Sequence, residues 1–242
     1  MKRICLILLS LLFLTSCSSP KTLCDYKIVY VDDSIHKIGT AYGDSNATRL
    51  INTVDIIVKV TAVSSSKPEY SKLGLPQFIH TVKILEVIKG SDFVSVGENI
   101  QVLSHCGYDS FSEYISSSPN SADARLKLTE TEIFEYSSDP EAMVALSEQN
   151  GLPLYEGGDF VLLLCYDEEF SRWTVWSDRS SVMEYVDGNL IGYAVEYLGK
   201  TYTEFVEAVE NAEKTPEIKY DMDYISGLQS GTVTADEYLP NN

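Results

Sequence analysis

The chain has few of the residues on which most enzyme sites depend. It contains three histidines, His36, His80 and His105, and none of them stands in a metal-binding spacing such as His-Glu-x-x-His. No Gly-x-Ser-x-Gly elbow, Walker loop or dinucleotide fingerprint occurs. The sequence therefore predicts no catalytic residue, no metal ion and no cofactor.

Basic residues are also scarce. Lys and Arg total 18 against 36 Asp and Glu, which gives a formal net charge of −18. A surface with this excess of acids repels phosphate backbones, so we expect no nucleic-acid partner. The same excess opposes electrostatic adhesion to anionic lipid, so attachment to a membrane would need another means.

One apolar run stands at the start of the chain. Ile4–Leu14 follows the basic Met1–Arg3 and is too short for a membrane span of about 20 residues. Its length is typical of a signal-peptide core, which has about 7–15 residues. The next stretch, Leu14-Thr15-Ser16-Cys17, resembles the lipobox of bacterial lipoproteins, in which the cysteine thiol receives a diacylglycerol and becomes the new N-terminus.

That resemblance implies an exported protein that is held at the cell membrane, facing the outside. Residues 1–16 would be removed, Cys17 would be lipidated, and residues 17–43 would form a tether and N-terminal lead. Two acyl chains give stable anchoring, at about 0.8 kcal/mol for each buried methylene. The alternative is a plain secretory signal in which Cys17 stands by chance.

Cysteines are sparse in the remaining chain. Beside Cys17 it contains Cys24, Cys106 and Cys165, an odd number for a compartment that permits disulfides. Cys165 lies within an apolar stretch, Phe160–Tyr166, and is expected to be a small core residue. We predict a disulfide between Cys24 and Cys106, with the other pairings left open because sequence alone does not fix connectivity.

Alternating apolar residues predict most of the regular structure. In the clearest strand, Val54, Ile56, Val58, Val60 and Ala62 fall on one face. Other strands are expected at 27–31, 77–88, 98–104, 159–166 and 172–176, with a hairpin at 182–196. Helices are expected at 44–51, 121–136, 139–151 and 202–214.

Four stretches carry a family resemblance: Val54–Val60, Val82–Gly90, Val96–Val102 and Glu156–Leu164. They resemble a group of uncharacterised secreted bacterial proteins, which is similar to the OB-fold barrel of netrin-like domains and tissue inhibitors of metalloproteinases. The resemblance implies an α+β, β-rich domain over 44–214. The resemblance covers 44–106 and 152–214 and implies an OB-like antiparallel barrel. The helical insertion at 107–151 departs from the family pattern; it, the C-terminal helix and the polar tail at 215–242 are predicted from the chain's own helix and turn signals.

The inhibitory activity of those relatives does not follow from the resemblance. The inhibitors coordinate zinc through the amine and carbonyl of a free N-terminal cysteine. Here the only terminal cysteine would be Cys17, whose amine stands beside lipid and is often acylated, and Cys24 is internal. The resemblance therefore implies the barrel without the zinc chemistry.

Three further features have both a functional and a structural interpretation, and the structural one is favoured each time. His105-Cys106 could contribute two metal ligands, but the end of a strand is the favoured interpretation. Asp167-Glu168-Glu169 could bind calcium, but a polar turn is favoured. A group of aromatic residues could bind glycans but also suits strands and cores; its members are Trp173, Trp176, Tyr185, Tyr193 and Tyr197.

The sequence thus predicts a surface-tethered module that binds or interacts without catalysis. Its partners would be the membrane, through lipid on Cys17, and an envelope protein or glycan. One alternative is a cell-envelope hydrolase with an unrecognised site, since carboxylate pairs can cleave glycosides without any short motif. Another is a ligand-binding lipoprotein of a transporter, although the chain is short for a two-lobed binder.

Overall fold

The computed structural model describes residues 27–32, 46–71, 74–147, 151–168, 170–177 and 179–215. Cys17, Cys24 and residues 216–242 lie outside these ranges. Lipidation, the Cys24–Cys106 disulfide and the polar tail therefore stay predictions. Among the helices within these ranges, none combines the length and the apolar composition that crossing a membrane requires.

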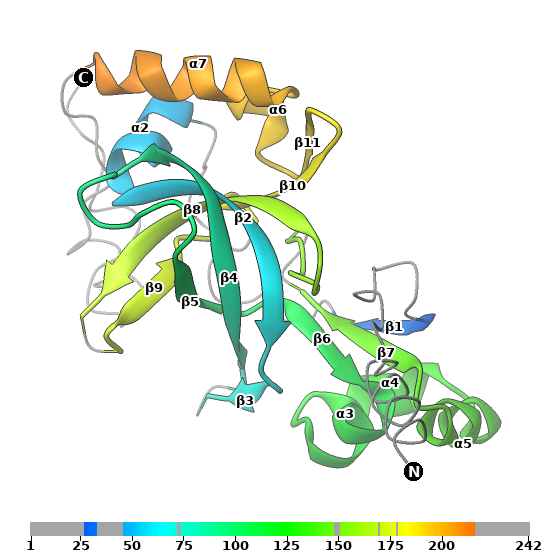
Figure 1. The fold of residues 1–242 in the computed structure, drawn as a ribbon. Coiled ribbons are helices and arrows are strands. Elements are labelled where there is room, and N and C mark those ends of the chain that lie inside the picture. The colour runs from blue at the N-terminus through cyan, green and yellow to red at the C-terminus, as the bar shows by residue number, and fades with distance from the viewer. Residues whose placement is uncertain are drawn as a thin grey trace, which may run out of the picture.

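The largest part of the fold is a closed five-stranded barrel (Figure 1). Its strands are β2 (Ile56–Ser65), β4 (Pro76–Lys89), β5 (Asn99–Ser104), β8 (Asp159–Asp167) and β9 (Arg172–Val175). They pair in the order β8-β2-β4-β5-β9, and β9 returns to β8. The expected β-rich α+β barrel is confirmed, and this order is compatible with an OB-like fold. One pair, β5 with β9, is parallel, so the barrel is not wholly antiparallel.

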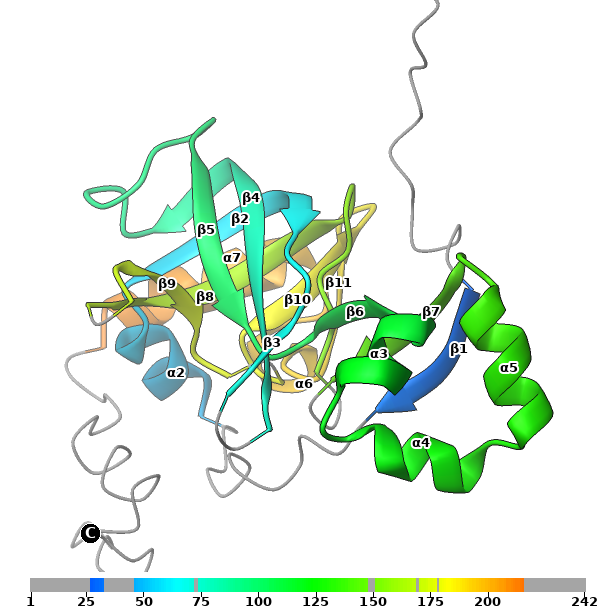
Figure 2. The same cartoon turned by 90° about the horizontal axis from the view of Figure 1, so that it is seen from below.

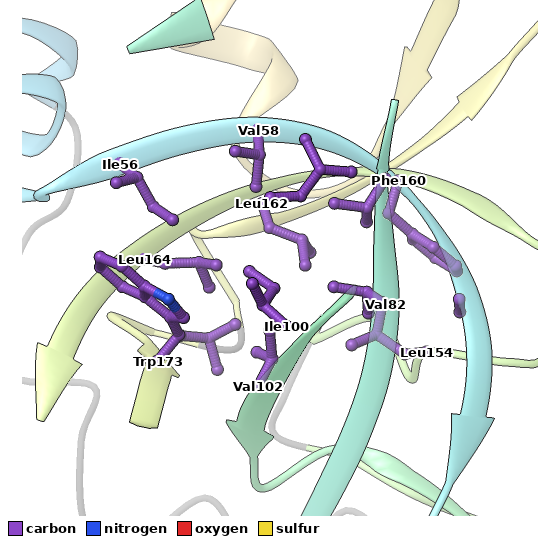
Figure 3. Packing of buried hydrophobic residues seen from close by; sticks show 14 of the residues in the cluster. Ile56, Val58, Val82, Ile100, Val102, Leu154, Phe160, Leu162, Leu164 and Trp173 are labelled. Carbon is purple, nitrogen blue, oxygen red and sulfur yellow. The ribbon is translucent and has the colours of Figure 1, made fainter. Parts of the chain in front are cut away.

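Apolar side chains from alternate strand positions fill the barrel. Ile56, Val82 and Leu162 are fully buried there and point toward one another (Figure 3). The expected inward face of β2 needs one correction, because Val54 belongs to a second core on the outer side of the barrel together with Ile57. Near its start β2 is thus buried on both faces, which explains why Ile57 interrupts the polar face of the pattern.

Two helices cover this second core. They are α2 (Ala47–Thr53) and α7 (Tyr202–Glu213), which contact each other on the outside of the barrel. The remaining elements of this part are β3 (Glu69–Tyr70), β10 (Val182–Val186), β11 (Asn189–Ile191) and α6 (Val195–Leu198). The expected C-terminal helix is confirmed, and the expected hairpin is confirmed in part, because its second strand ends at Ile191 and α6 occupies the end of the range. Asn46 caps α2, and Thr201 caps α7 through a capping box.

The insertion is an α+β unit and is not purely helical. Its elements are β6 (Gly107–Ser110), α3 (Phe111–Ser117), α4 (Ser121–Lys127), α5 (Glu130–Ser138) and β7 (Ala142–Leu146). The early strand β1 (Lys27–Asp32) pairs in parallel with β7 and completes a sheet in the order β1-β7-β6. We call these six elements the insertion unit. Figures 1 and 2 show it at the end of the molecule opposite α7.

Of the two helices expected in this unit, the one at 139–151 is wrong and the one at 121–136 is correct only in part. The helix expected from Asp139 to Gly151 is replaced by strand β7, because pairing with β1 and β6 outweighs the local capping signals. The helix expected over 121–136 is broken in two, since Thr129 forms a capping box with Glu132 and starts α5 anew.

Candidate functional site

A pocket of about 410 Å³, which we call the junction pocket, lies between the barrel and the insertion unit. Its size falls within the roughly 300–1,000 Å³ that small-molecule sites occupy. The lining comes from the end of β2 and the loop after it, from β6, α3 and β7, and from the segment before β8. The lining residues are Ser65, Ser66, Lys67, Tyr108, Asp109, Ser110, Glu113, Met143, Leu154, Tyr155 and Glu156.

The two parts of the molecule are joined by a buried ring. Phe78 belongs to β4 but packs with Phe111 and Leu146 of the insertion unit. Gly107 begins β6 directly against this ring, where an added Cβ would lie 2.7 Å from the ring carbons of Phe78. Glycine therefore permits the close approach that places β6 beside the barrel and forms the pocket between them.

A serine and a histidine from neighbouring strands meet at the pocket. Ser65, which lines it, and His80, which is fully buried, are cross-strand partners on β2 and β4. The Ser65 Oγ lies 2.6 Å from His80 Nδ1, and His80 Nε2 lies 3.2 Å from the Cys106 carbonyl oxygen. Because a carbonyl oxygen only accepts, Nε2 carries the proton and Nδ1 accepts the Ser65 hydroxyl proton. The Ser65 oxygen is thereby left as an acceptor on the pocket side.

His80 is poorly suited to remove that proton. Burial disfavours the imidazolium and lowers the pKa of His80 to about 4, although the hydrogen bond to the Cys106 carbonyl opposes the shift. A general base works best when its pKa is close to the working pH, and an imidazolium is best stabilised by a carboxylate. The pair therefore orients the Ser65 hydroxyl more readily than it activates it.

Acidic groups dominate the charge of the lining. Asp109 is only 5% exposed, and its burial raises the pKa of its carboxyl to about 6, while its Oδ1 accepts a 2.8 Å hydrogen bond from the Ser110 amide. The one lysine of the lining, Lys67, forms an ion pair with Glu113. Glu156 adds a further acid, so the pocket disfavours anionic ligands.

Two tyrosines, Tyr108 and Tyr155, add phenol groups to the lining beside its serines. Burial raises the pKa of Tyr108 to about 12. The Tyr155 hydroxyl donates to Glu184, which fixes its ring beside the pocket, and the ring also packs edge-on against Phe160 of the barrel core. These rings and the Ser65 hydroxyl give the pocket hydrogen-bonding and stacking groups of the kind that hold polar ligands.

The insertion side of the pocket rests on a second buried polar contact. The Tyr114 hydroxyl of α3 donates to Asp32 Oδ2 at 2.8 Å, and both residues are buried. Burial, followed by the charge of Asp32, raises the pKa of Tyr114. The contact ties β1 to α3, and α3 contributes Glu113 to the lining.

The residues that the sequence singled out lie elsewhere or serve the fold. Cys106 is buried, and its carbonyl accepts the His80 hydrogen bond. Cys165 has a free thiol, and burial raises its pKa to about 12. His105 donates through Nδ1 to the Pro76 carbonyl at 2.7 Å. Within the described ranges, no group of three or more His, Cys, Asp or Glu side chains is placed to hold a metal ion.

The aromatic residues are used mostly in packing. Trp173 lies in the barrel core, and its ring meets Tyr166 edge-on. Lys59 places its ammonium 3.3 Å from the ring centroid of Tyr185, and Arg179 lies 3.5 Å from that of Tyr193. The faces of these two tyrosines thus contact the protein's own cations. The chain matches no protein-family model and no curated protein.

Proposed function

We propose that the protein is a surface-tethered lipoprotein whose folded body binds a small polar ligand without transforming it. The observation that carries the proposal is the junction pocket, in which His80 holds the Ser65 hydroxyl oxygen as an acceptor. Because the Ser65 hydroxyl is already held in one orientation, less side-chain entropy of the protein is lost when a ligand binds. The lipobox-like stretch that ends at Cys17 supports the tether.

One observation favours a second candidate, a cell-envelope hydrolase. Ser65 and His80 form a nucleophile-and-base pair that the sequence alone did not suggest. Two features make binding the better proposal. His80 is fully buried, with its pKa lowered to about 4, and its Nε2 donates to a carbonyl oxygen and not to a carboxylate.

The lining also restricts the ligand. Acids outnumber bases in the pocket, which weighs against phosphates and carboxylates, whereas hydroxyl groups find both donors and acceptors there. Tyrosine rings suit the faces of sugars and of peptide groups. An envelope glycan or a polar peptide segment therefore fits this pocket better than a nucleotide or a fatty acid.

The test is a binding screen with a blocked pocket. Glu156 is exposed on the lining, so Glu156→Trp should fill the opening at little cost in stability; Glu210→Trp, on the exposed face of α7, is the matched control. Ligand-observed NMR would be run with neutral oligosaccharides, short peptides and p-nitrophenyl esters. We expect the oligosaccharides and peptides to bind saturably to the wild type and to Glu210→Trp, and this binding to be lost in Glu156→Trp.

Two outcomes would contradict the proposal. Equal binding by all three proteins would place the site outside the pocket. Turnover of an ester that is abolished by Ser65→Ala, with the fold intact, would establish the hydrolase instead. The tether is tested separately by metabolic labelling with a fatty-acid analogue, which should mark the wild type and not Cys17→Ala.

A further inference from the structure

Two apolar side chains at one end of the molecule are almost fully exposed. Leu126 on α4 is 85% exposed and Phe134 on α5 is 76% exposed, the highest values among the large apolar residues described. The next two, Phe93 and Val96, are each 66% exposed and lie in the turn between β4 and β5. Figures 1 and 2 show α4 and α5 at one end of the molecule and that turn at the other. Single exposed apolar residues are common, so only their position in the molecule can indicate whether they form an interaction surface.

The covalent tether proposed above would place the first of these ends next to the membrane. Strand β1 begins at Lys27, ten residues after Cys17, and ten residues reach at most about 35 Å when fully extended. A compact body of this size has a radius of gyration of about 17 Å and is roughly 45 Å across. The tether is therefore shorter than the body, and the insertion unit, which contains β1, is the part kept nearest the bilayer.

Contacts fix both helices beside the strand where the tether enters. Lys27 Nζ lies 3.2 Å from Asp139 Oδ2 at the end of α5 and 5.3 Å from the centroid of the Tyr136 ring. At the end of α4, Lys127 Nζ lies 5.9 Å from the centroid of the Tyr30 ring on β1. The helices that carry the two exposed side chains thus flank the strand through which the lipid anchor is attached.

We propose that the exposed surface of α4 and α5 rests on the lipid bilayer, with Leu126 and Phe134 in the headgroup region. This proposal depends on the lipid anchor at Cys17 proposed above. Apolar side chains at an interface lie about 5–10 Å deep, between headgroups and acyl chains. Arg125 and Lys127 flank Leu126, but the Arg125 guanidinium donates to the Ile115 carbonyl at 2.7 Å and Lys127 lies over the Tyr30 ring. The contact with lipid therefore rests on the two apolar side chains. The barrel end with Phe93 would face away from the membrane.

The test uses fluorescence quenching by brominated lipid. The full lipidated chain, carrying Phe134→Trp or Leu126→Trp, would be reconstituted into phosphatidylcholine vesicles with or without bromine on the acyl chains. Phe93→Trp is the matched control, because it makes the same change as Phe134→Trp on a phenylalanine that is also mostly exposed, at the other end of the molecule. The emission added by the new tryptophan is obtained by subtracting the wild type, which contains Trp173 and Trp176. We expect brominated lipid to remove most of it for positions 134 and 126 and to leave it unchanged for position 93.

Flotation of the same samples separates the two proposals. Protein that fails to float with the vesicles lacks the anchor, which overturns the tether and this orientation together. Protein that floats, but shows no quenching at positions 134 and 126 or equal quenching at position 93, overturns the orientation alone. A concentration-dependent dimer in detergent that Leu126→Ser with Phe134→Ser abolishes would assign the surface to a second copy of the chain and would also overturn it.

Discussion

The neutral, buried His80 predicts a specific dependence of stability on pH. Its pKa is lowered to about 4 from the ordinary value of 6.5, because burial disfavours the charged ring. Between those two values the unfolded chain binds more protons than the folded one, so the free energy of unfolding falls as pH falls through this window. Each pKa unit corresponds to about 1.36 kcal/mol, which gives a full effect of about 3 kcal/mol and about 2 kcal/mol at pH 5.

Asp109 acts in the opposite direction. Its pKa is raised to about 6 from 3.8, mainly by burial, so the folded chain binds more protons between those values and gains stability as pH falls through them. From pH 7 to pH 5 this gain is about 1 kcal/mol. The two groups partly cancel in the wild type, and substitutions are needed to separate them.

The assay is urea unfolding at pH 7 and pH 5, followed by circular dichroism. His80→Gln keeps an amide donor for the Cys106 carbonyl but does not titrate, so its stability should fall by about 2 kcal/mol less than that of the wild type. The free energy of unfolding of Asp109→Asn should fall by about 1 kcal/mol more than that of the wild type between pH 7 and pH 5. The same pH dependence in wild type and His80→Gln would show that His80 is not held neutral, and the orientation assigned to the Ser65 hydroxyl would lose its basis.

Two other predictions follow from single contacts, and a third follows from the cysteine pattern of the sequence. Gly90→Ala should lower the free energy of unfolding by more than about 2 kcal/mol, because φ is +82° and the new Cβ would lie 2.6 Å from a backbone carbonyl oxygen. Gly97→Ala is the control: φ is +88°, but nothing lies within 4 Å of the new Cβ, so the loss in the same unfolding assay should be only about 1 kcal/mol. Tyr114→Phe should cost about 1–3 kcal/mol in that assay, because a buried carboxylate loses its hydroxyl donor, and an unchanged midpoint would refute this. Non-reducing peptide mapping should recover Cys24 joined to Cys106, and recovery of both as free thiols would rule the bond out.

The strands of the barrel could be predicted because their signals are local, whereas their closure into a barrel was expected from the family resemblance. In β2 the residues Ile56, Val58 and Val60 alternate with others along a single strand, and that period is enough to identify a strand with an apolar face. The Lys89-Gly90 turn depends on contacts that are distant in sequence. Lys89 Nζ donates to the carbonyl of Ile51 in α2 and to that of Val54 just after α2, so this family-like motif serves the fold.

The insertion unit and the pocket depend on contacts that sequence distance conceals. Strand β7 exists because it pairs with β1, more than a hundred residues earlier, so local signals at Asp139 indicated a helix instead. Ser65 and His80 are only 15 residues apart, but three register shifts lie along the β2–β4 pair. Only a correct prediction of the β2–β4 register would have placed Ser65 opposite His80.

If the junction pocket holds a small ligand that the protein does not transform, that ligand should stay bound to protein extracted gently from bacterial membranes. Mass spectrometry under non-denaturing conditions would detect it. We expect an additional non-protein mass on the wild type and on Glu210→Trp that is absent from Glu156→Trp and unchanged after prolonged incubation. No bound mass on any of the three, the same mass on Glu156→Trp, or conversion of the mass to a product over time would show that the pocket is not such a binding site.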